Sequence, residues 1–315
     1  MDRTRPAPAF TGPQPALSRY RLANGGEVAA RGAAVTIGNF DGVHRGHRAL
    51  VARALEVGER RGLRSVALTF DRHPATVVRP GHVPRLLTGL EQKVALLLSA
   101  GVDEVAVLRF DAERAGEEAE DFVRTVLVGE LGARAVVVGA SFRFGHRQHG
   151  DVALLEAMGG ELGFEVEEVE LLTDELDGRP VVVSSTVIRS LVSGGRLEEA
   201  ARLLGRPHEV PGVLLGPPFP GVSWCLSVEV RPELLLPPPG RYAGDVAPVG
   251  TDERDPEKER DLAIVTVPDG PPAAGGILVE LSARDSLASA PRTAGLAVND
   301  QVAVRFAGRA PQPAR

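Results

Sequence analysis

The sequence VTIGNFDGVHRGHR, from Val35 to Arg48, combines the end of a strand, a glycine-rich turn and the start of a helix. Its first residues, Val35-Thr36-Ile37, are β-formers, and the strand pattern breaks at Gly38. Apolar residues then recur at helical spacing, at Leu50, Val51, Ala54 and Leu55. A strand, turn and helix in this order present free backbone N–H groups and the positive end of a helix dipole to an anion. The stretch therefore predicts a phosphate site at a helix start.

His44 and His47 lie three residues apart, so we expect both on the first helical turn, facing the same bound group. Imidazoles there supply N–H donors and positive charge where charge develops during transfer of a phosphate group. A pair of surface histidines is the alternative interpretation, which the preceding turn Gly38–Gly42 disfavours. A zinc site fits less well, because the motif lacks Cys partners and a zincin Glu, and no Walker A ending follows.

The composition indicates a globular protein, with 315 residues, 43% hydrophobic and 25% charged. A net charge of −6 argues against broad electrostatic binding of nucleic acid, so local donors must hold any phosphate. The single cysteine, Cys225, excludes an internal disulfide framework and suits a reducing compartment. No signal-peptide core or apolar run of membrane-spanning length is present. We expect a cytoplasmic protein with no nucleic-acid partner and no membrane association.

From Ala33 to Val183, short β-rich runs alternate with helical patterns. The predicted strands are Ala33–Ile37, Ser65–Phe70, Glu104–Leu108, Ala135–Gly139, Glu165–Leu171 and Val181–Val183. The predicted helices are His47–Arg61, Leu90–Ala100, Glu117–Leu131 and Val152–Leu162. This alternation indicates an α/β fold, with a Rossmann-like parallel sheet and helices on both faces. Ligands of such sheets bind at the carboxyl ends of the strands, where Gly38–His47 and Gly139–Gly150 are expected.

The composition and the hydrophobic pattern of the chain change after Pro207. Before it, Ser184-Ser185-Thr186 offers N-cap chemistry for a helix that continues to Gly194, and a short helix covers Leu197–Leu204. After it, prolines are dense and four runs have strand length, Val222–Val230, Leu262–Val267, Ile277–Leu281 and Gln301–Phe306. These runs predict a small β-domain of barrel or sandwich type, with Thr251–Asp261 as a solvated loop. We therefore expect a loose leader over residues 1–16, an α/β domain over 17–207 and a β-domain over 208–315.

Four ordered motifs resemble the bacterial FAD synthetases, the FMN adenylyltransferase module of bifunctional riboflavin kinase/FAD synthetases. The motifs are Gly38–His47; Thr69–Pro74, with Leu87-Thr88 and Lys93 following; Val138–Gly145, with Gly150-Asp151 following; and Ser184–Arg189, with the junction Leu203–Pro207. The resemblance covers about Val35 to Pro207. His-x-Gly-His alone would indicate only the wider nucleotidylyltransferase superfamily.

The resemblance implies an ATP site and a flavin site. The ATP-binding residues would be Gly38, Asn39, Phe40, Asp41, Gly42, His44, His47, Ser184, Ser185, Thr186 and Arg189. Of these, His44, His47 and Arg189 would act on the reacting phosphates, although Ser184–Thr186 taken alone favours a simple helix cap. The flavin-binding residues would be His73, Pro74, Ser141, Phe142, Arg143 and Phe144. The aromatic pair is the least specific of these signals, because aromatics at this spacing are more often core residues.

The implied reaction is attack by an FMN phosphate oxygen on the α-phosphorus of ATP, giving FAD and pyrophosphate. Such a reaction depends on positioning and charge neutralisation more than on a strong base. Mg²⁺ is expected with ATP, held by few protein ligands and several waters, and the sequence does not identify its ligands. Two alternatives stay open, namely an adenylyltransferase acting on another flavin phosphate and a non-catalytic flavin- or nucleotide-binding regulatory protein.

The C-terminal region resembles the riboflavin kinase barrel of bifunctional relatives, with its phosphate chemistry altered. The glycine- and arginine-rich loop of the family is replaced by Gly216–Gly221, in which prolines remove N–H donors. A carboxylate, Glu229, stands where the family has an amide, and Glu280 aligns with the catalytic acid. We expect the kinase activity to be lost or severely impaired. The domain would then serve as a lid, a docking surface for the flavin phosphate or a contact in a homo-oligomer.

Overall fold

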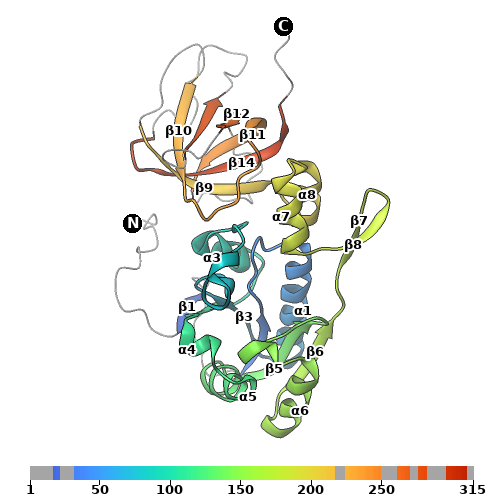
Figure 1. Cartoon of the computed structure of the whole chain (residues 1–315). Helices are drawn as coiled ribbons and strands as arrows, with labels where there is room; N and C mark the ends of the chain where they lie inside the picture. The colour runs from blue at the N-terminus through green and yellow to red at the C-terminus, as the bar shows by residue number, and fades with distance from the viewer. Residues whose placement is uncertain are drawn as a thin grey trace. The chain divides into compact units, whose positions relative to one another are not determined.

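The computed structural model describes residues 17–21, 32–216, 224–249, 261–269, 276–281 and 296–310 (Figure 1). The described residues form two compact units, one within residues 1–39, 50–83 and 97–169, the other within 40–49, 84–96 and 170–315. These units are defined by packing and alternate along the chain, whereas the predicted boundary at residue 207 divides the chain by sequence and stays a prediction. No helix among the described residues is long and apolar enough to cross a membrane.

The first unit contains a six-stranded sheet in the order β1-β4-β3-β2-β5-β6 (Figure 1). Its strands are β1 (Leu17–Arg21), β2 (Ala33–Ile37), β3 (Arg64–Phe70), β4 (Glu104–Leu108), β5 (Ala133–Gly139) and β6 (Glu165–Val169). Strands β2 to β6 pair in parallel, with Val35 of the central strand opposite Val66 and Val136. All residues of β2 are buried, as a strand covered on both faces requires. The predicted α/β fold with a parallel sheet is confirmed.

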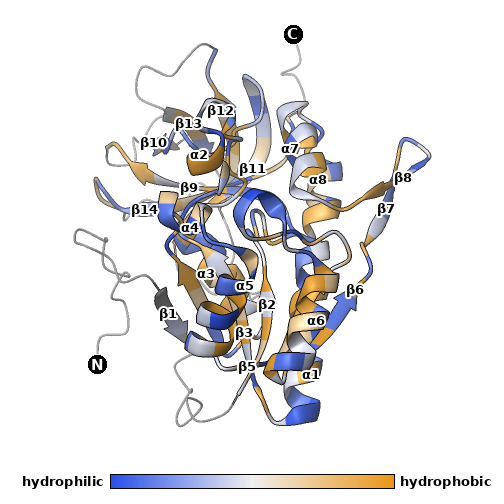
Figure 2. Ribbon diagram, turned by 60° about the horizontal axis from the view of Figure 1, so that its bottom comes forward, coloured by the Kyte–Doolittle hydropathy of each residue, from blue (hydrophilic) through white to orange (hydrophobic). Residues whose placement is uncertain are grey.

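Helices cover both faces of this sheet. The helices among the described residues are α1 (Arg45–Arg61), α2 (Ala75–Val78), η2 (Pro80–His82), α3 (Leu90–Ser99), α4 (Ala112–Ala115), α5 (Ala119–Phe122), η3 (Val123–Glu130), η4 (His146–Gln148), α6 (Val152–Leu162), α7 (Ser185–Ser193) and α8 (Leu197–Leu204). Ala54 and Val57 of α1 pack with Ala34 of β2 on one face. Val126 of η3 and Leu155 of α6 pack on the other face. Figure 2 shows β2 and β3 coloured mainly as hydrophobic segments, which matches their burial between the two helical layers.

Three local differences separate the structure from the sequence-based expectation. Strand β1, which was not predicted, pairs antiparallel with β4 at the sheet edge. The predicted strand Val181–Val183 lies in a hairpin apart from the parallel sheet, formed by β7 (Thr173–Leu176) and β8 (Arg179–Val182). The hairpin turns at Asp177 and Gly178, both with positive φ, as an Asp-Gly hairpin turn requires. The predicted helix Glu117–Leu131 is α5 followed by the π-helical η3, where Leu131 N donates to Val126 O.

The C-terminal part of the second unit is a closed antiparallel barrel in the order β10-β13-β12-β11-β14-β9. Its strands are β9 (His208–Leu214), β10 (Trp224–Val230), β11 (Gly240–Pro248), β12 (Asp261–Val267), β13 (Gly276–Leu281) and β14 (Gln301–Arg309). The sequence predicted the runs corresponding to four of these strands and did not predict β9 or β11 as strands. The predicted choice of barrel or sandwich is therefore decided in favour of a barrel.

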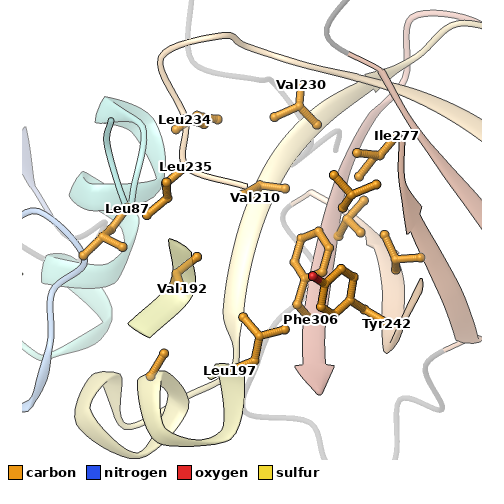
Figure 3. Close-up of a cluster of buried hydrophobic side chains, with 14 of the residues drawn as sticks. Leu87, Val192, Leu197, Val210, Val230, Leu234, Leu235, Tyr242, Ile277 and Phe306 are labelled. Carbon is orange, nitrogen blue, oxygen red and sulfur yellow. The ribbon is translucent and has the colours of Figure 1, made fainter. Parts of the chain in front are cut away.

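The barrel shares its hydrophobic core with α7 and α8, all within the second unit. Tyr242 and Phe306 fill the barrel interior, with their rings packed edge to face and the ring centroids 5.8 Å apart (Figure 3). Ile188 of α7 and Leu197 of α8 are fully buried in the same cluster. Leu87, from the segment before α3, belongs to it as well (Figure 3). One continuous core therefore supports the barrel and the two helices that follow the β7–β8 hairpin.

Candidate active site

The turn before α1 adopts an unusual backbone conformation. Phe40, Gly42 and Val43 all have positive φ, at 50°, 84° and 39°. A Cβ on Gly42 would lie 2.9 Å from Leu87 Cδ1, so glycine is required there by both conformation and space. Phe40 and Val43 are fully buried, and their strained conformations persist because the surrounding packing holds them. Backbone strain of this kind is concentrated at functional sites.

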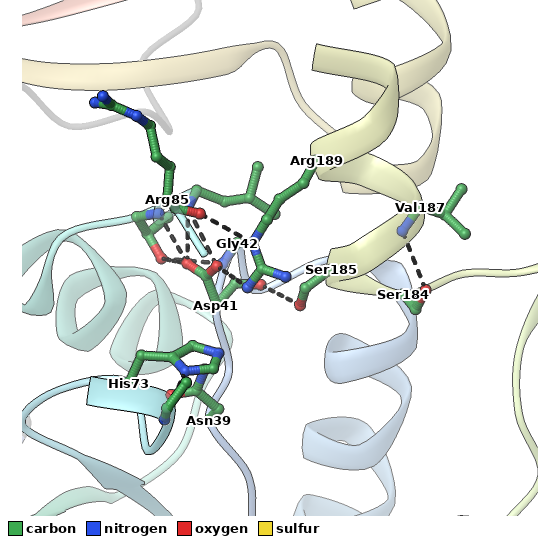
Figure 4. Close-up of polar contacts among 12 residues, drawn as sticks. Asn39, Asp41, Gly42, His73, Arg85, Ser184, Ser185, Val187 and Arg189 are labelled. Carbon is green, nitrogen blue, oxygen red and sulfur yellow. Dashed lines mark hydrogen bonds and ion pairs between the residues drawn. The ribbon is translucent and has the colours of Figure 1, made fainter. Parts of the chain in front are cut away.

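Asp41 organises the second unit around this turn. Its carboxylate, 3% exposed, accepts hydrogen bonds from Leu87 N at 2.9 Å and from Thr88 N at 3.0 Å. Thr88 Oγ1 also donates to it at 3.3 Å, and Gly42 N donates to Thr88 Oγ1 at 3.0 Å. Arg189 Nη2 donates to the other carboxylate oxygen at 2.6 Å (Figure 4). The carboxylate is thus saturated by donors from two distant segments.

The start of α7 lies against the same turn. Ser185 Oγ donates to the Asp41 carbonyl oxygen at 2.8 Å, and Arg189 Nε donates to the Arg85 carbonyl at 3.0 Å (Figure 4). Ser184 is the N-cap of the helix, because its Oγ accepts from Val187 N at 3.4 Å. The structure thus brings Asp41, Ser185 and Arg189 together, while Thr186 is exposed. A contact of Ser184 or Thr186 with a phosphate stays a prediction.

His44 and His47 stack on each other at the start of α1, with ring centroids 3.6 Å apart and planes at 19°. His44 precedes the helix and its Nδ1 accepts from His47 N at 3.3 Å, so only His47 lies in the first turn. The His47 ring also meets Phe40 edge to face at 5.1 Å. His47 Nδ1 is buried and has no hydrogen-bond partner among the described residues. A ligand atom that formed a hydrogen bond with this nitrogen would supply the missing partner.

Both imidazoles are neutral near pH 7, which corrects the expectation that they supply positive charge. Burial lowers the pKa of His44 to about 4; the Asp41 carboxylate opposes this shift, and Arg206 and Arg189 add to it. Burial also lowers the pKa of His47 well below its ordinary value, and His44 and Lys93 act in the same direction. The histidines therefore act as neutral hydrogen-bonding groups in the free protein, and Arg189 carries the permanent positive charge.

The low pKa of His44 predicts a loss of stability in mild acid. The folded-state pKa of about 4 lies below the unfolded value of 6.5, so the unfolded chain binds more protons between these pH values. The contribution is complete well above pH 6.5 and is lost as pH falls toward 4; between pH 7 and pH 5.5 we expect the loss to be about 1.2 kcal/mol. Urea unfolding of the native chain and of His44→Gln at both pH values measures it. An equal pH dependence in the two proteins would contradict the assignment.

Asn39 and the residues predicted to bind the flavin lie in the first unit. Gly38 N donates to Leu68 O at 3.1 Å, and Asn39 O accepts from Thr69 Oγ1 at 3.2 Å, which fixes the end of β2 against β3. His73 Nδ1 accepts from Ala75 N at 3.1 Å, and Pro74 is the N-cap residue of α2. These contacts hold the turn after β3 in one conformation.

Phe142 and Phe144 stack with ring centroids 5.4 Å apart and planes at 16°. Both are partly buried and pack against the core of the first unit, as the core interpretation of this pair expects. Arg143 Nη1 lies 3.8 Å from Asp151 Oδ2, and both Arg143 and Ser141 are exposed. A flavin contact of Ser141, Phe142, Arg143 or Phe144 stays a prediction.

Sequence reasoning named Arg189 but did not identify the backbone donors that hold Asp41. Leu87 and Thr88 were noted as motif residues, but their backbone N–H groups carry no side-chain signature. The predicted site also did not include the Arg85 carbonyl. Nor did it include the two cations that influence the histidine pKa values, Lys93 and Arg206. Among the described residues, no group of three or more His, Cys, Asp or Glu side chains is placed to hold a metal ion.

Comparison with known proteins agrees with the motif resemblance. Residues 27–187 match the FAD synthetase family. The bifunctional riboflavin kinase/FMN adenylyltransferase of Escherichia coli (strain K12) is 37% identical over 181 residues, 58% of this chain and 56% of that protein. The protein of the same name from Pseudomonas fluorescens is 39% identical over 185 residues, 59% of this chain and 58% of that protein. The aligned part of the chain therefore spans little more than half the length of these curated relatives.

A solved structure resembles a larger part of the chain. The crystal structure of a macrolide-efflux protein from Streptococcus pneumoniae resembles this chain with a TM-score of 0.70, over 90% of this chain and 87% of that protein's chain. Its sequence identity is 21%, so the likeness concerns the fold alone. The C-terminal barrel fits a riboflavin kinase-like domain in its closed six-stranded topology.

Proposed function

Because the chain belongs to the FAD synthetase family, we propose that it transfers AMP from ATP to FMN, giving FAD and pyrophosphate. The observation that carries the proposal is the arrangement of Asp41, Arg189 and the paired histidines around the strained turn before α1. A permanent cation, neutral imidazole donors and a helix start suit the developing charge of a phosphoryl group. The names of the curated relatives support the same reaction.

The proposed reaction needs no strong base from the protein. An oxygen of the FMN phosphate attacks the α-phosphorus of ATP, the new P–O bond forms, and the bond to the β-phosphate oxygen breaks to release pyrophosphate. The second pKa of a phosphate monoester is about 6, so the attacking oxygen is already deprotonated near neutral pH. Arg189 and the N–H donors at the start of α1 would bind the ATP phosphates, and His44 and His47 would orient them as neutral hydrogen-bonding groups.

Mg²⁺ would neutralise charge on the ATP phosphates. Among the described residues, no cluster of carboxylates or histidines is placed to hold it, and the Asp41 carboxylate is already bonded to Leu87, Thr88 and Arg189. The proposed Mg²⁺ is therefore one held by the nucleotide and by water. Asp41 would position Arg189 and the turn.

We also propose that riboflavin kinase activity is lost or severely impaired. The support is the sequence Gly216–Gly221, of which residues 217–221 lie outside the described residues. In the barrel, Glu280 pairs with Cys225 across β13 and β10, and its carboxylate lies 3.2 Å from Arg241 Nη2. This ion pair occupies the carboxylate that the family resemblance assigned as the catalytic acid.

One product-resolved assay tests both proposals. The chain is incubated with ATP and Mg²⁺ and with either FMN or riboflavin, and the flavins are separated by chromatography. We expect FAD from FMN and no FMN from riboflavin. Formation of FMN from riboflavin would overturn the loss of kinase activity. Tight flavin binding without turnover would favour a regulatory protein, and turnover only with another flavin phosphate would change the acceptor.

A further inference from the structure

The barrel of the second unit is joined by hydrogen bonds to the segment that holds Asp41. Leu86 N donates to Glu233 O at 2.8 Å, and Leu235 N donates to Leu86 O at 2.8 Å. These bonds form a parallel bridge between Leu86 and Leu234. Glu233–Leu235 belongs to the loop between strands β10 and β11. The barrel loop therefore extends as a short strand along the residues directly before Leu87 and Thr88.

Side chains strengthen this junction from both sides. Arg85 Nη1 donates to Pro232 O, while the Arg85 carbonyl accepts from Arg189 Nε at 3.0 Å. Leu87 and Leu234 are each 1% exposed and belong to one buried cluster (Figure 3). The backbone of residues 85–88 is thus bonded to the barrel loop through Leu86 and to the Asp41–Arg189 pair through its neighbours.

His208 anchors the barrel loop. It is the first residue of β9 and is 1% exposed, and its Nε2 lies 2.8 Å from Leu235 O, to which it must donate because a carbonyl only accepts. Its ring stacks on that of Phe306 in the barrel core, with the ring centroids 6.1 Å apart. Removing this donor would take the partner away from the buried Leu235 carbonyl. The N–H group of the same residue, Leu235, donates to Leu86 O. A continuous path of bonds therefore runs from His208 through Leu235 and Leu86 to the donors of Asp41.

We propose that His208 and the barrel loop Glu233–Leu235 are positioning elements of the adenylyl-transfer site, fixing the segment that holds Asp41 and Arg189. The inference rests on the proposed function for its kinetic consequence. The barrel would then have a role in adenylyl transfer that does not depend on any kinase activity of the barrel. The ATP-binding geometry depends on the barrel because Leu87 N and Thr88 N are held in place from that side.

The test uses the full chain with His208→Leu, His208→Gln and, as a matched control, Tyr242→Phe. Tyr242 Oη donates to Pro238 O at 2.6 Å, so Tyr242→Phe also removes a partly buried side-chain bond to a carbonyl of the same barrel loop, beyond the residues that contact Leu86. We expect His208→Leu to lower kcat/KM for ATP about tenfold, mainly through KM, because the phosphate-binding groups are misplaced. His208→Gln, which retains a donor, should stay within about threefold of the native chain, and Tyr242→Phe within about twofold.

A merely structural role would lower the active fraction, and therefore kcat, at unchanged KM for ATP. That pattern in His208→Leu, or an equal fall in Tyr242→Phe, would overturn the proposal. If His208→Leu does not fold, Arg85→Ala gives the second test, because it removes the bond to Pro232 and keeps the Arg85 carbonyl. We expect Arg85→Ala to raise KM for ATP about threefold, and an unchanged KM would overturn the proposal.

Amide hydrogen exchange separates this inference from the proposed function. Leu87 N and Thr88 N donate to Asp41, so their exchange reports the positioning without any turnover. We expect faster exchange at both amides in His208→Leu and no change in Tyr242→Phe. Absence of FAD formation by the native chain would refute the proposed function alone. Unchanged exchange at Leu87 and Thr88 in His208→Leu would refute the positioning role alone.

Discussion

Replacing Arg189 with alanine should lower kcat/KM for ATP by about 10²- to 10³-fold, the effect of losing one preorganised charged donor at a reacting phosphate. Arg189 is the permanent cation bonded to Asp41, at 2.6 Å, and its side chain is 16% exposed. The variant leaves the Asp41 carboxylate with its backbone donors, so the stability should fall by only about 1–3 kcal/mol. Steady-state kinetics and a thermal melt on the same preparation measure both effects.

Arg196→Ala is the matched control for that variant. Arg196 lies in the same region of the chain, and its guanidinium forms ion pairs with Asp177 and Glu199 on the surface. We expect Arg196→Ala to retain native kinetics, since exposed pairs contribute little. Arg189→Lys should recover only part of the activity, because an ammonium group cannot bond Asp41 and the Arg85 carbonyl with the same planar geometry. Full activity of Arg189→Ala in the folded protein would remove Arg189 from the site.

Replacing His47 with alanine should lower kcat by about 10²-fold, because a buried ring nitrogen that we assign to the ATP phosphates is lost. The loss of stacking on His44 and of the edge-to-face contact with Phe40 should also destabilise the turn. His47→Gln tests whether hydrogen bonding alone is needed, since it keeps a neutral donor and acceptor of similar reach. We expect it to recover at least tenfold of the lost kcat.

His82→Ala serves as the control for His47→Ala, because His82 is an exposed histidine in η2. It should leave kcat and KM unchanged. A melt that collapses for His47→Ala while the surviving folded protein keeps native kcat would show that His47 only supports the fold. A native kcat in a fully folded His47→Ala protein would exclude the assigned role as well.

The bounds of a strand were predictable from the sequence where all residues of the strand are buried and apolar or small. Strand β2 matches its predicted bounds at both ends, because every residue from Ala33 to Ile37 is buried and the turn begins at Gly38. Strand β1, LSRYR, has no alternation strong enough to separate it from its surroundings. Strands β9 and β11 contain Pro211, Gly240 and Gly244, residues that interrupt a strand pattern in the sequence but are accommodated in a closed barrel.

The sequence indicated which motif residues would lie close together, and it indicated less about their electrostatics. The motifs located His44, His47, Ser185 and Arg189, which the second unit brings to one turn. The sequence could not show that both histidines are buried enough to be neutral, because desolvation depends on packing from other segments.

The backbone partners of Asp41 were not predictable for a related reason. Its donors are backbone groups of Leu87 and Thr88, which lie 46 and 47 residues further along the chain. A backbone N–H is present at every residue except proline, so its use at one place leaves no trace in residue type. The same holds for the bridge between Leu86 and Leu234, by which the barrel reaches this segment.

The most direct measurement is the yield of FAD and of pyrophosphate in one reaction of the full chain with FMN, ATP and Mg²⁺. Adenylyl transfer to FMN predicts that the two products form in equal amounts and that both depend on FMN. Pyrophosphate release without FAD, or no product from a chain that binds both substrates, would contradict FMN adenylyl transfer.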